Sequence, residues 1–112
     1  MRLHKTDEYS SVFNFRCSVG GGTVQVLAMP NHYGHARLGV IVSRKISKRA
    51  VDRNYMKRAL REFFRLNQQG CGNLDIVIRV RKIFYSKMLP ELHQELAQHL
   101  SGLKKCHVFS ST

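Results

Sequence analysis

The segment from Arg44 to Arg65 constrains this chain most, because it is strongly basic and has the spacing of an amphipathic helix. It contains nine of the nineteen Lys and Arg residues and only two acids, Asp52 and Glu62. At about 100° per residue, its charged and apolar side chains separate onto opposite sides of a helix. The charged side holds Arg53, Asn54, Lys57, Arg58, Arg61 and Arg65, and the apolar side holds Met56, Ala59, Leu60 and Phe63, with Phe64 at its border. We therefore expect one side to be buried and the other to bind an extended anion.

The overall charge agrees with an anionic partner. The 112 residues carry a formal net charge of +12 and a pI near 10.3, which is typical of proteins that bind polyanions. A hydrophobic content of 43% is enough for one modest core, so we expect a single domain over residues 1–112. Membrane surfaces are also anionic, and charge alone does not distinguish them from nucleic acid.

Other features favour a cytoplasmic protein that does not bind membranes. No apolar run approaches the roughly 20 residues that span a bilayer, and the first ten residues lack the apolar stretch of a secretory signal. Cys17, Cys71 and Cys106 are odd in number and far apart in sequence. We expect them to be free thiols, because this pattern does not suit a disulfide framework.

The remaining pattern predicts an α+β domain, a small α-β-β-α-β-α sandwich with one central sheet packed by helices. A short first helix should end before the glycine run Gly20–Gly22, which we interpret as a hinge. Two strands at Thr23–Met29 and Arg37–Ser43 should form an antiparallel hairpin around the loop Pro30–Ala36. The basic helix should run from about Lys48 to Leu66, and a strand at Leu74–Val80 should return beside an earlier strand as a β-α-β unit. A last helix should start near Leu89 or Pro90, and residues 105–112 should be frayed.

From Arg37 to Phe64 the chain resembles the protein subunit of bacterial ribonuclease P. The matching elements are Arg37-Leu38-Gly39-Val40, Ser43-Arg44-Lys45, Arg53-Asn54-Tyr55, Lys57-Arg58 and Arg61-Glu62. The resemblance extends over about residues 2–100. One position departs from it, because the family has Arg-Asn-Arg where this chain has Tyr55 as the third residue. Tyrosine cannot neutralise a phosphate, and the sequence leaves open whether Tyr55 stacks on RNA, faces solvent or packs into the protein.

The resemblance implies a fold like the second domain of ribosomal protein S5. It also implies a left-handed crossover between the strands that flank the basic helix, where pattern reasoning alone predicts a right-handed one. It further implies that the protein binds a catalytic RNA, one protein per RNA, and also binds precursor tRNA. That RNA would remove the 5′ leader with Mg²⁺ that the RNA binds. The protein itself would hold no metal, have no catalytic residue and need no protein partner.

Two sets of site residues follow. For the catalytic RNA we expect contacts from Arg44, Lys45, Lys48, Arg49, Arg53, Asn54, Lys57, Arg58, Arg61 and Arg65. Asn54 could equally bond to RNA or to the protein around it. For the leader the resemblance implies a cleft between the first helix and the sheet, lined by Tyr9, Phe13, Arg16 and Lys5. We expect Val12 to be buried. Which sheet residues line the cleft depends on the strand register, which the sequence does not give.

Three alternatives compete with this hypothesis. A basic helix face is often merely solvated, and a structural RNA-binding protein, such as a ribosomal protein or an RNA chaperone, would share the charge and the fold class. A stand-alone nuclease is disfavoured, because the seven acids look like a helix cap or isolated surface positions rather than a metal-binding cluster. His32 and His35 have no further metal ligand near them in sequence.

Overall fold

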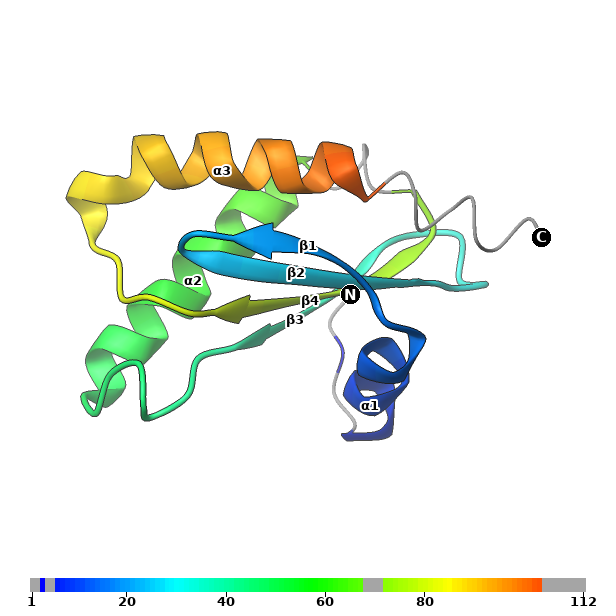
Figure 1. Ribbon diagram of the computed structural model, residues 1–112, viewed down its shortest axis with the longest axis horizontal. Helices are drawn as coiled ribbons and strands as arrows, with labels where there is room; N and C mark the ends of the chain where they lie inside the picture. Colours follow the sequence, from blue (N-terminus) through cyan, green and yellow to red (C-terminus); the bar gives the residue numbers. More distant parts are fainter. Residues whose placement is uncertain (1–2, 4–5, 68–71, 104–112) are drawn as a thin grey trace.

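The structure of the protein, a computed structural model, describes residues 3, 6–67 and 72–103. Over these residues it has an α+β fold with a four-stranded mixed sheet and three α-helices (Figure 1). In chain order the elements are α1 (Thr6–Phe15), β1 (Cys17–Gly21), β2 (Val24–Pro30), β3 (Arg37–Ile41), α2 (Ala50–Asn67), β4 (Leu74–Val80), the 3₁₀ turn η2 (Ser86–Met88) and α3 (Leu89–Gly102). The expectation of fraying at 105–112 concerns residues outside the described part.

The strand order is β1-β2-β4-β3, with β4 antiparallel to β2 and parallel to β3. The predicted hairpin of the strands at Thr23–Met29 and Arg37–Ser43 is therefore wrong, because β4 lies between them. Six of the seven residues of β4 are buried, so this strand needs cover on both faces and neighbours on both edges. The predicted β-α-β unit is confirmed as β3-α2-β4. The hand of its crossover stays a prediction.

A strand that the sequence did not predict, β1, pairs antiparallel with β2. The glycine run is thus the end of β1 and its turn into β2 rather than a hinge, and the element order is α-β-β-β-α-β-α. Gly21 and Gly22 have φ of 139° and 71°, which side chains rarely adopt. The signal was weak because β1 has five residues, two of them glycine, and its pairing comes from β2 rather than from its own propensity.

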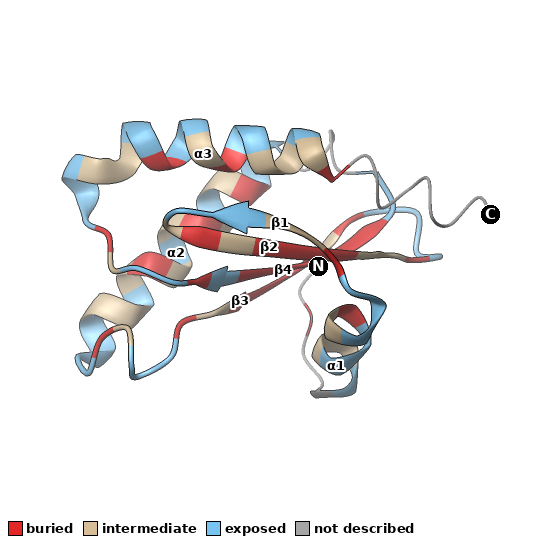
Figure 2. Cartoon of the chain, in the orientation of Figure 1, coloured by how far each residue is buried: buried red, intermediate tan, exposed pale blue. Residues whose placement is uncertain are grey.

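The two faces of the sheet carry two separate cores (Figure 2). On the larger one, alternate residues of all four strands pack against α2 and α3. Leu92 and Leu96 of α3 are buried there, as is Leu103 directly after the helix. On the other face a small cluster joins Val12 of α1 to Leu3, Leu27 and Val77. No helix in the described ranges is long and apolar enough to cross a membrane.

One expectation about the cysteines is wrong. Cys17 is buried and disulfide-bonded in the structure, so it is not a free thiol. The expectation came from separation along the chain, which does not limit how close two residues come in a folded protein. Cys71 and Cys106 lie outside the described residues.

Candidate nucleic-acid interface

The basic helix α2 separates its two sides as the sequence predicts. Met56, Leu60 and Phe64 are buried against the sheet, and Ala59 and Phe63 pack partly against the same core. All ten residues predicted to bind the catalytic RNA lie in described positions, and none of them is buried. Six are exposed, on α2 or in the loop before it: Arg44, Lys45, Lys48, Arg49, Asn54 and Arg58. Arg65 is exposed as well, while Arg53, Lys57 and Arg61 are partly covered.

A pocket at the start of α2 is lined by cations alone. Its volume is about 540 Å³, and its walls are Arg44, Lys45, Lys48 and Arg53. Arg53 shapes it, because its Nη1 donates hydrogen bonds to the carbonyl oxygens of Ser47 at 2.9 Å and Lys48 at 3.0 Å. These bonds hold the loop before α2 against the helix, and they leave four positive charges around one hollow. Such an arrangement repels itself unless an anion occupies it.

The two acids of α2 do not cancel its charge. The Asp52 carboxylate lies 3.8 Å from the Arg49 Nε and accepts a hydrogen bond from the Ser47 hydroxyl. Both of its partners belong to the loop before the helix. Glu62 pairs with Arg65 at 2.5 Å, and this hydrogen bond lowers the pKa of the Glu62 carboxyl. Asp52 and Glu62 are thus each paired with an Arg three residues away, and α2 keeps an excess of basic over acidic residues.

Tyr55 packs into the protein, which answers the question that the sequence left open. Its ring lies 6.3 Å from that of Phe84 and joins the larger core. Its hydroxyl is buried, with no hydrogen-bond partner within the part of the chain that the structure describes. Tyr55 therefore cannot stack on RNA in this conformation.

The second predicted site lies between α1 and the sheet. Tyr9 and Phe13 are half-buried at the edge of the smaller core, and Val12 between them is fully buried, as expected. The Tyr9 hydroxyl donates to the carbonyl oxygen of Leu3 at 3.4 Å. Arg16 follows α1 with φ of 64° and is exposed. Lys5 lies outside the described residues.

The register shows which sheet residues share the face with α1. Three rows cross the sheet on this side. The middle row, under α1, is Ser18, Leu27, Val77 and Gly39; on one side of it lie Met29, Asp75 and Arg37, and on the other Gly20, Gln25, Arg79 and Ile41. Gly39 passes directly beneath the Tyr9 ring, since a Cβ there would lie 2.5 Å from the Tyr9 Cε1.

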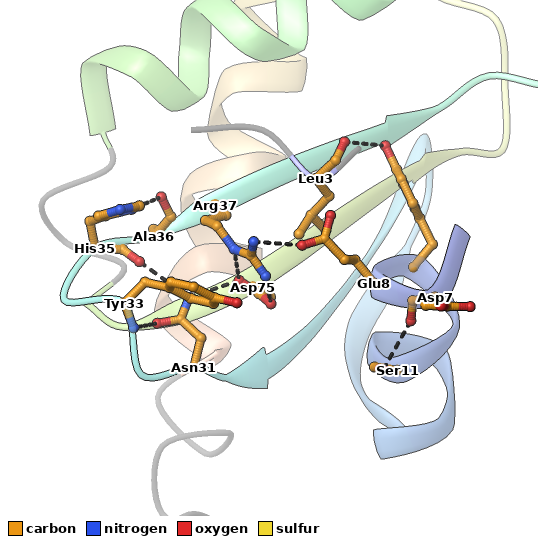
Figure 3. Close-up of polar contacts among 11 residues, drawn as sticks. Leu3, Asp7, Glu8, Ser11, Asn31, Tyr33, His35, Ala36, Arg37 and Asp75 are labelled. Carbon is orange, nitrogen blue, oxygen red and sulfur yellow. Dashed lines mark hydrogen bonds and ion pairs between the residues drawn. The ribbon is translucent and has the colours of Figure 1, made fainter. Parts of the chain in front are cut away.

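Arg37 joins three elements at one end of this face (Figure 3). Its Nε and Nη2 donate to the two carboxylate oxygens of Asp75 at 2.8 and 2.7 Å, and its Nη1 donates to Glu8 of α1 at 2.6 Å. The Tyr33 ring covers the guanidinium at 4.0 Å. The hydrogen bond to Asp75 raises the pKa of Arg37, burial opposes that rise, and Glu8 adds to it. Asp75 is thus a buried, paired acid, and the expectation that it is an isolated surface residue is wrong.

A pocket of about 470 Å³ lies beside this cluster. Its walls include Asp7, Ser11, Met29 and Tyr33. The Asn31 amide donates to Asp75 at 2.8 Å and so ties the loop before β3 to the same carboxylate. Sequence reasoning used Arg37 only as part of a motif and missed this network. Its partners lie 29 and 38 residues away along the chain, so no local pattern could have revealed it.

Comparison with known proteins identifies the family. The family model described as Ribonuclease P matches residues 1–104. The ribonuclease P protein component of Chromobacterium violaceum is 45% identical over 111 residues, which cover 99% of this chain and 92% of that one. Among solved structures, the ribonuclease P protein of Staphylococcus aureus superposes with a TM-score of 0.79 at 28% identity, over 89% of this chain and 92% of that chain. The protein of Thermotoga maritima gives 0.74 at 28% identity, over 89% and 94%. This chain belongs to the ribonuclease P protein family.

Proposed function

We propose that this chain is the protein subunit of a ribonuclease P holoenzyme and binds the catalytic RNA through α2 and the loop before it. The pocket lined by Arg44, Lys45, Lys48 and Arg53 is the observation that carries the proposal, because its walls include no carboxylate. An RNA backbone supplies the matching row of negative charges. Contacts of this kind depend on backbone shape rather than on base sequence.

The same subunit binds the 5′ leader of precursor tRNA at α1. Tyr9 and Phe13 are one helical turn apart, and each keeps part of its ring accessible beside the sheet. An unpaired base can stack there, which is typically worth roughly 1–3 kcal/mol per base. Arg16 extends the site with one exposed positive charge.

Hydrolysis belongs to the RNA and the Mg²⁺ that the RNA binds. The protein contributes positive charge between two polyanions, the catalytic RNA and the precursor, and so lowers their repulsion. Lower repulsion strengthens Mg²⁺ binding by the RNA indirectly. We propose one protein per RNA in the cytoplasm, with no catalytic residue in the protein and no protein or membrane partner.

Reconstitution tests the proposal. The chain, the ribonuclease P RNA of its own organism and a precursor tRNA are mixed at low Mg²⁺, and leader removal is measured with and without protein. We expect the protein to stimulate cleavage. Arg44→Glu should weaken binding to the RNA and flatten the slope of log affinity against log salt by about 0.9, the value for one phosphate contact. Lys87→Glu, the same reversal on the exposed turn before α3, is the matched control and should change neither.

The result also separates the alternatives. A structural RNA-binding protein would bind RNA with the same salt dependence but would not stimulate leader removal. Cleavage by the protein without the RNA would place the chemistry in the protein and contradict the proposal. Tyr9→Ala should weaken precursor binding relative to mature tRNA and leave the affinity for the catalytic RNA unchanged.

A further inference from the structure

One row of the sheet on the α1 side lies beyond the helix. This row consists of one residue from each strand: Gly20, Gln25, Arg79 and Ile41. On every strand it is displaced by two residues from the row on which α1 packs. Two residues correspond to about 7 Å of strand. Gly20 and Arg79 are exposed, and Gln25 and Ile41 are half-buried. This row therefore offers accessible sheet surface next to Tyr9 and Phe13.

Arg79 differs from the other arginine on this face. Its neighbours Ile78 and Val80 are buried, while its own side chain is exposed. Its side chain makes no hydrogen bond or ion pair with any residue that the structure describes. Arg37 is instead held by two carboxylates, Asp75 and Glu8. The guanidinium of Arg79 is thus available to an external anion, and that of Arg37 is not.

The charges on this face are also unequally distributed. Around Arg37 lie three acids, Asp7, Glu8 and Asp75, in or beside the pocket at that end. At the opposite end Arg79 pairs in register with Ile41, three residues before Arg44 of the cationic pocket. Figure 1 shows α1 below one half of the sheet and the loop from β3 to α2 below its other end. Arg79 thus lies on the sheet surface between the leader site and the cationic pocket.

We propose that Arg79 binds a backbone phosphate of the precursor's single-stranded leader, which crosses the sheet between α1 and the Arg44 pocket rather than entering the acidic pocket beside Tyr33. This inference rests on the proposed function and adds a leader-binding residue and a path to it. The chemistry is a charge-assisted hydrogen bond from an unpaired guanidinium to a phosphate oxygen. A stacked base on Tyr9 or Phe13 and a phosphate on Arg79 would together hold one extended strand without reading its sequence.

The test compares Arg79→Gln with Lys87→Gln, the same charge loss on a distant exposed turn. Affinity is measured for the assembled holoenzyme with a precursor carrying a long leader and with mature tRNA. We expect Arg79→Gln to weaken precursor binding by roughly three- to tenfold, as for loss of one exposed charge-assisted contact. Its salt slope for the precursor should fall by about 0.7, the single-strand value for one phosphate. The affinity of Arg79→Gln for mature tRNA should stay unchanged. The affinities of Lys87→Gln for the precursor and for mature tRNA should also stay unchanged.

Two further variants make the result decisive. Arg79→Lys keeps the charge and should keep the salt slope, which a purely structural role would not predict. Because Arg79 is exposed, thermal unfolding of Arg79→Gln should match that of the wild type. Equal loss of precursor and mature tRNA binding would overturn the inference. So would no loss for Arg79→Gln together with a selective loss for Tyr33→Ala, since the leader would then cross the other end of the face.

Failure of the inference and of the proposed function give different results. If Tyr9→Ala weakens only precursor binding while Arg79→Gln changes nothing, the leader site stands and the path over Arg79 is wrong. If the wild-type protein fails to stimulate leader removal at all, the proposed function itself is wrong.

Discussion

Gly39 and Tyr9 explain one position of the motif Arg37-Leu38-Gly39-Val40. Leu38 and Val40 face the larger core, and Arg37 is held by carboxylates on two other elements. Gly39 lies on the opposite face, where the Tyr9 ring occupies the space of a Cβ: its Cε1 would be 2.5 Å away and its hydroxyl oxygen 2.7 Å away. The glycine therefore lets an aromatic residue of α1 approach the sheet closely.

Gly39→Ala should consequently displace the Tyr9 ring. We expect a loss of about 1–3 kcal/mol in the free energy of unfolding, the usual cost of inserting a methyl group into a packed site. In a Tyr9→Ala background most of this loss should disappear, because the clashing ring is gone. A double-mutant cycle by denaturant unfolding measures both values. The same loss in both backgrounds would show that Gly39 is required for another reason.

Helix α3 is fastened to the turn between β1 and β2 by a single carboxylate. Glu95 accepts hydrogen bonds from the backbone amides of Val24 at 3.0 Å and Thr23 at 3.1 Å, and the His99 Nε2 lies 3.2 Å away. Burial alone would raise the pKa of Glu95, but the two amides and His99 outweigh it and hold the pKa below its ordinary value. The turn that follows the unpredicted strand β1, and the start of β2, are thus held by a residue 71 to 72 positions later in the chain.

This contact predicts a pH-dependent stability. Because the pKa of Glu95 is lower in the folded state, its contribution is complete above the unfolded pKa and is lost as the pH falls through the folded pKa. Glu95→Gln should therefore cost about 1–2 kcal/mol near pH 7, and the cost should shrink as the pH falls through the lowered pKa of Glu95. Glu91→Gln, on an exposed residue one turn earlier, is the control. Urea unfolding at several pH values measures the difference, and a cost that does not change with pH would contradict this role.

Helix α2 and strand β4 show which structural features sequence periodicity can predict. The boundaries of β4 and the start of α3 are confirmed, as are the buried and exposed sides of α2, because each is a repeating pattern within one element. Strand pairing is not such a pattern. The predicted hairpin of β2 and β3 is wrong because β4 lies between them and pairs with both. The apolar run of β4 is buried most completely when this strand has a neighbour on each edge.

The whole molecule carries a charge that its fold must tolerate. A formal net charge of +12 is spread over a domain of about 42 × 28 × 22 Å. At low salt the screening length, about 30 Å at 0.01 M, is comparable with the molecule, so its positive charges repel one another throughout. At 0.15 M the length falls to about 8 Å, and only near neighbours still interact.

Salt should therefore stabilise the free protein while it weakens RNA binding. We expect the melting temperature to rise by several degrees between 0.01 and 0.15 M NaCl, where about 4–8 °C corresponds to 1 kcal/mol for a domain near this size. The double variant Arg44→Glu/Arg58→Glu lowers the formal charge by four and should show a smaller rise. Thermal unfolding followed by circular dichroism measures both. An equal rise in both proteins would mean that self-repulsion is not the cause.

The sequence by itself determined the local features of this protein: an amphipathic basic helix, most of the strands, a strong positive charge and a motif order that matches one family. These follow from residue type and spacing within single elements. The tertiary structure decided which distant residues meet. It buried Tyr55 against Phe84, joined Arg37 to Asp75 and Glu8, and left Arg79 exposed beside α1. Such contacts depend on how the strands compete for burial across the whole chain, and no pattern within one segment contains that information.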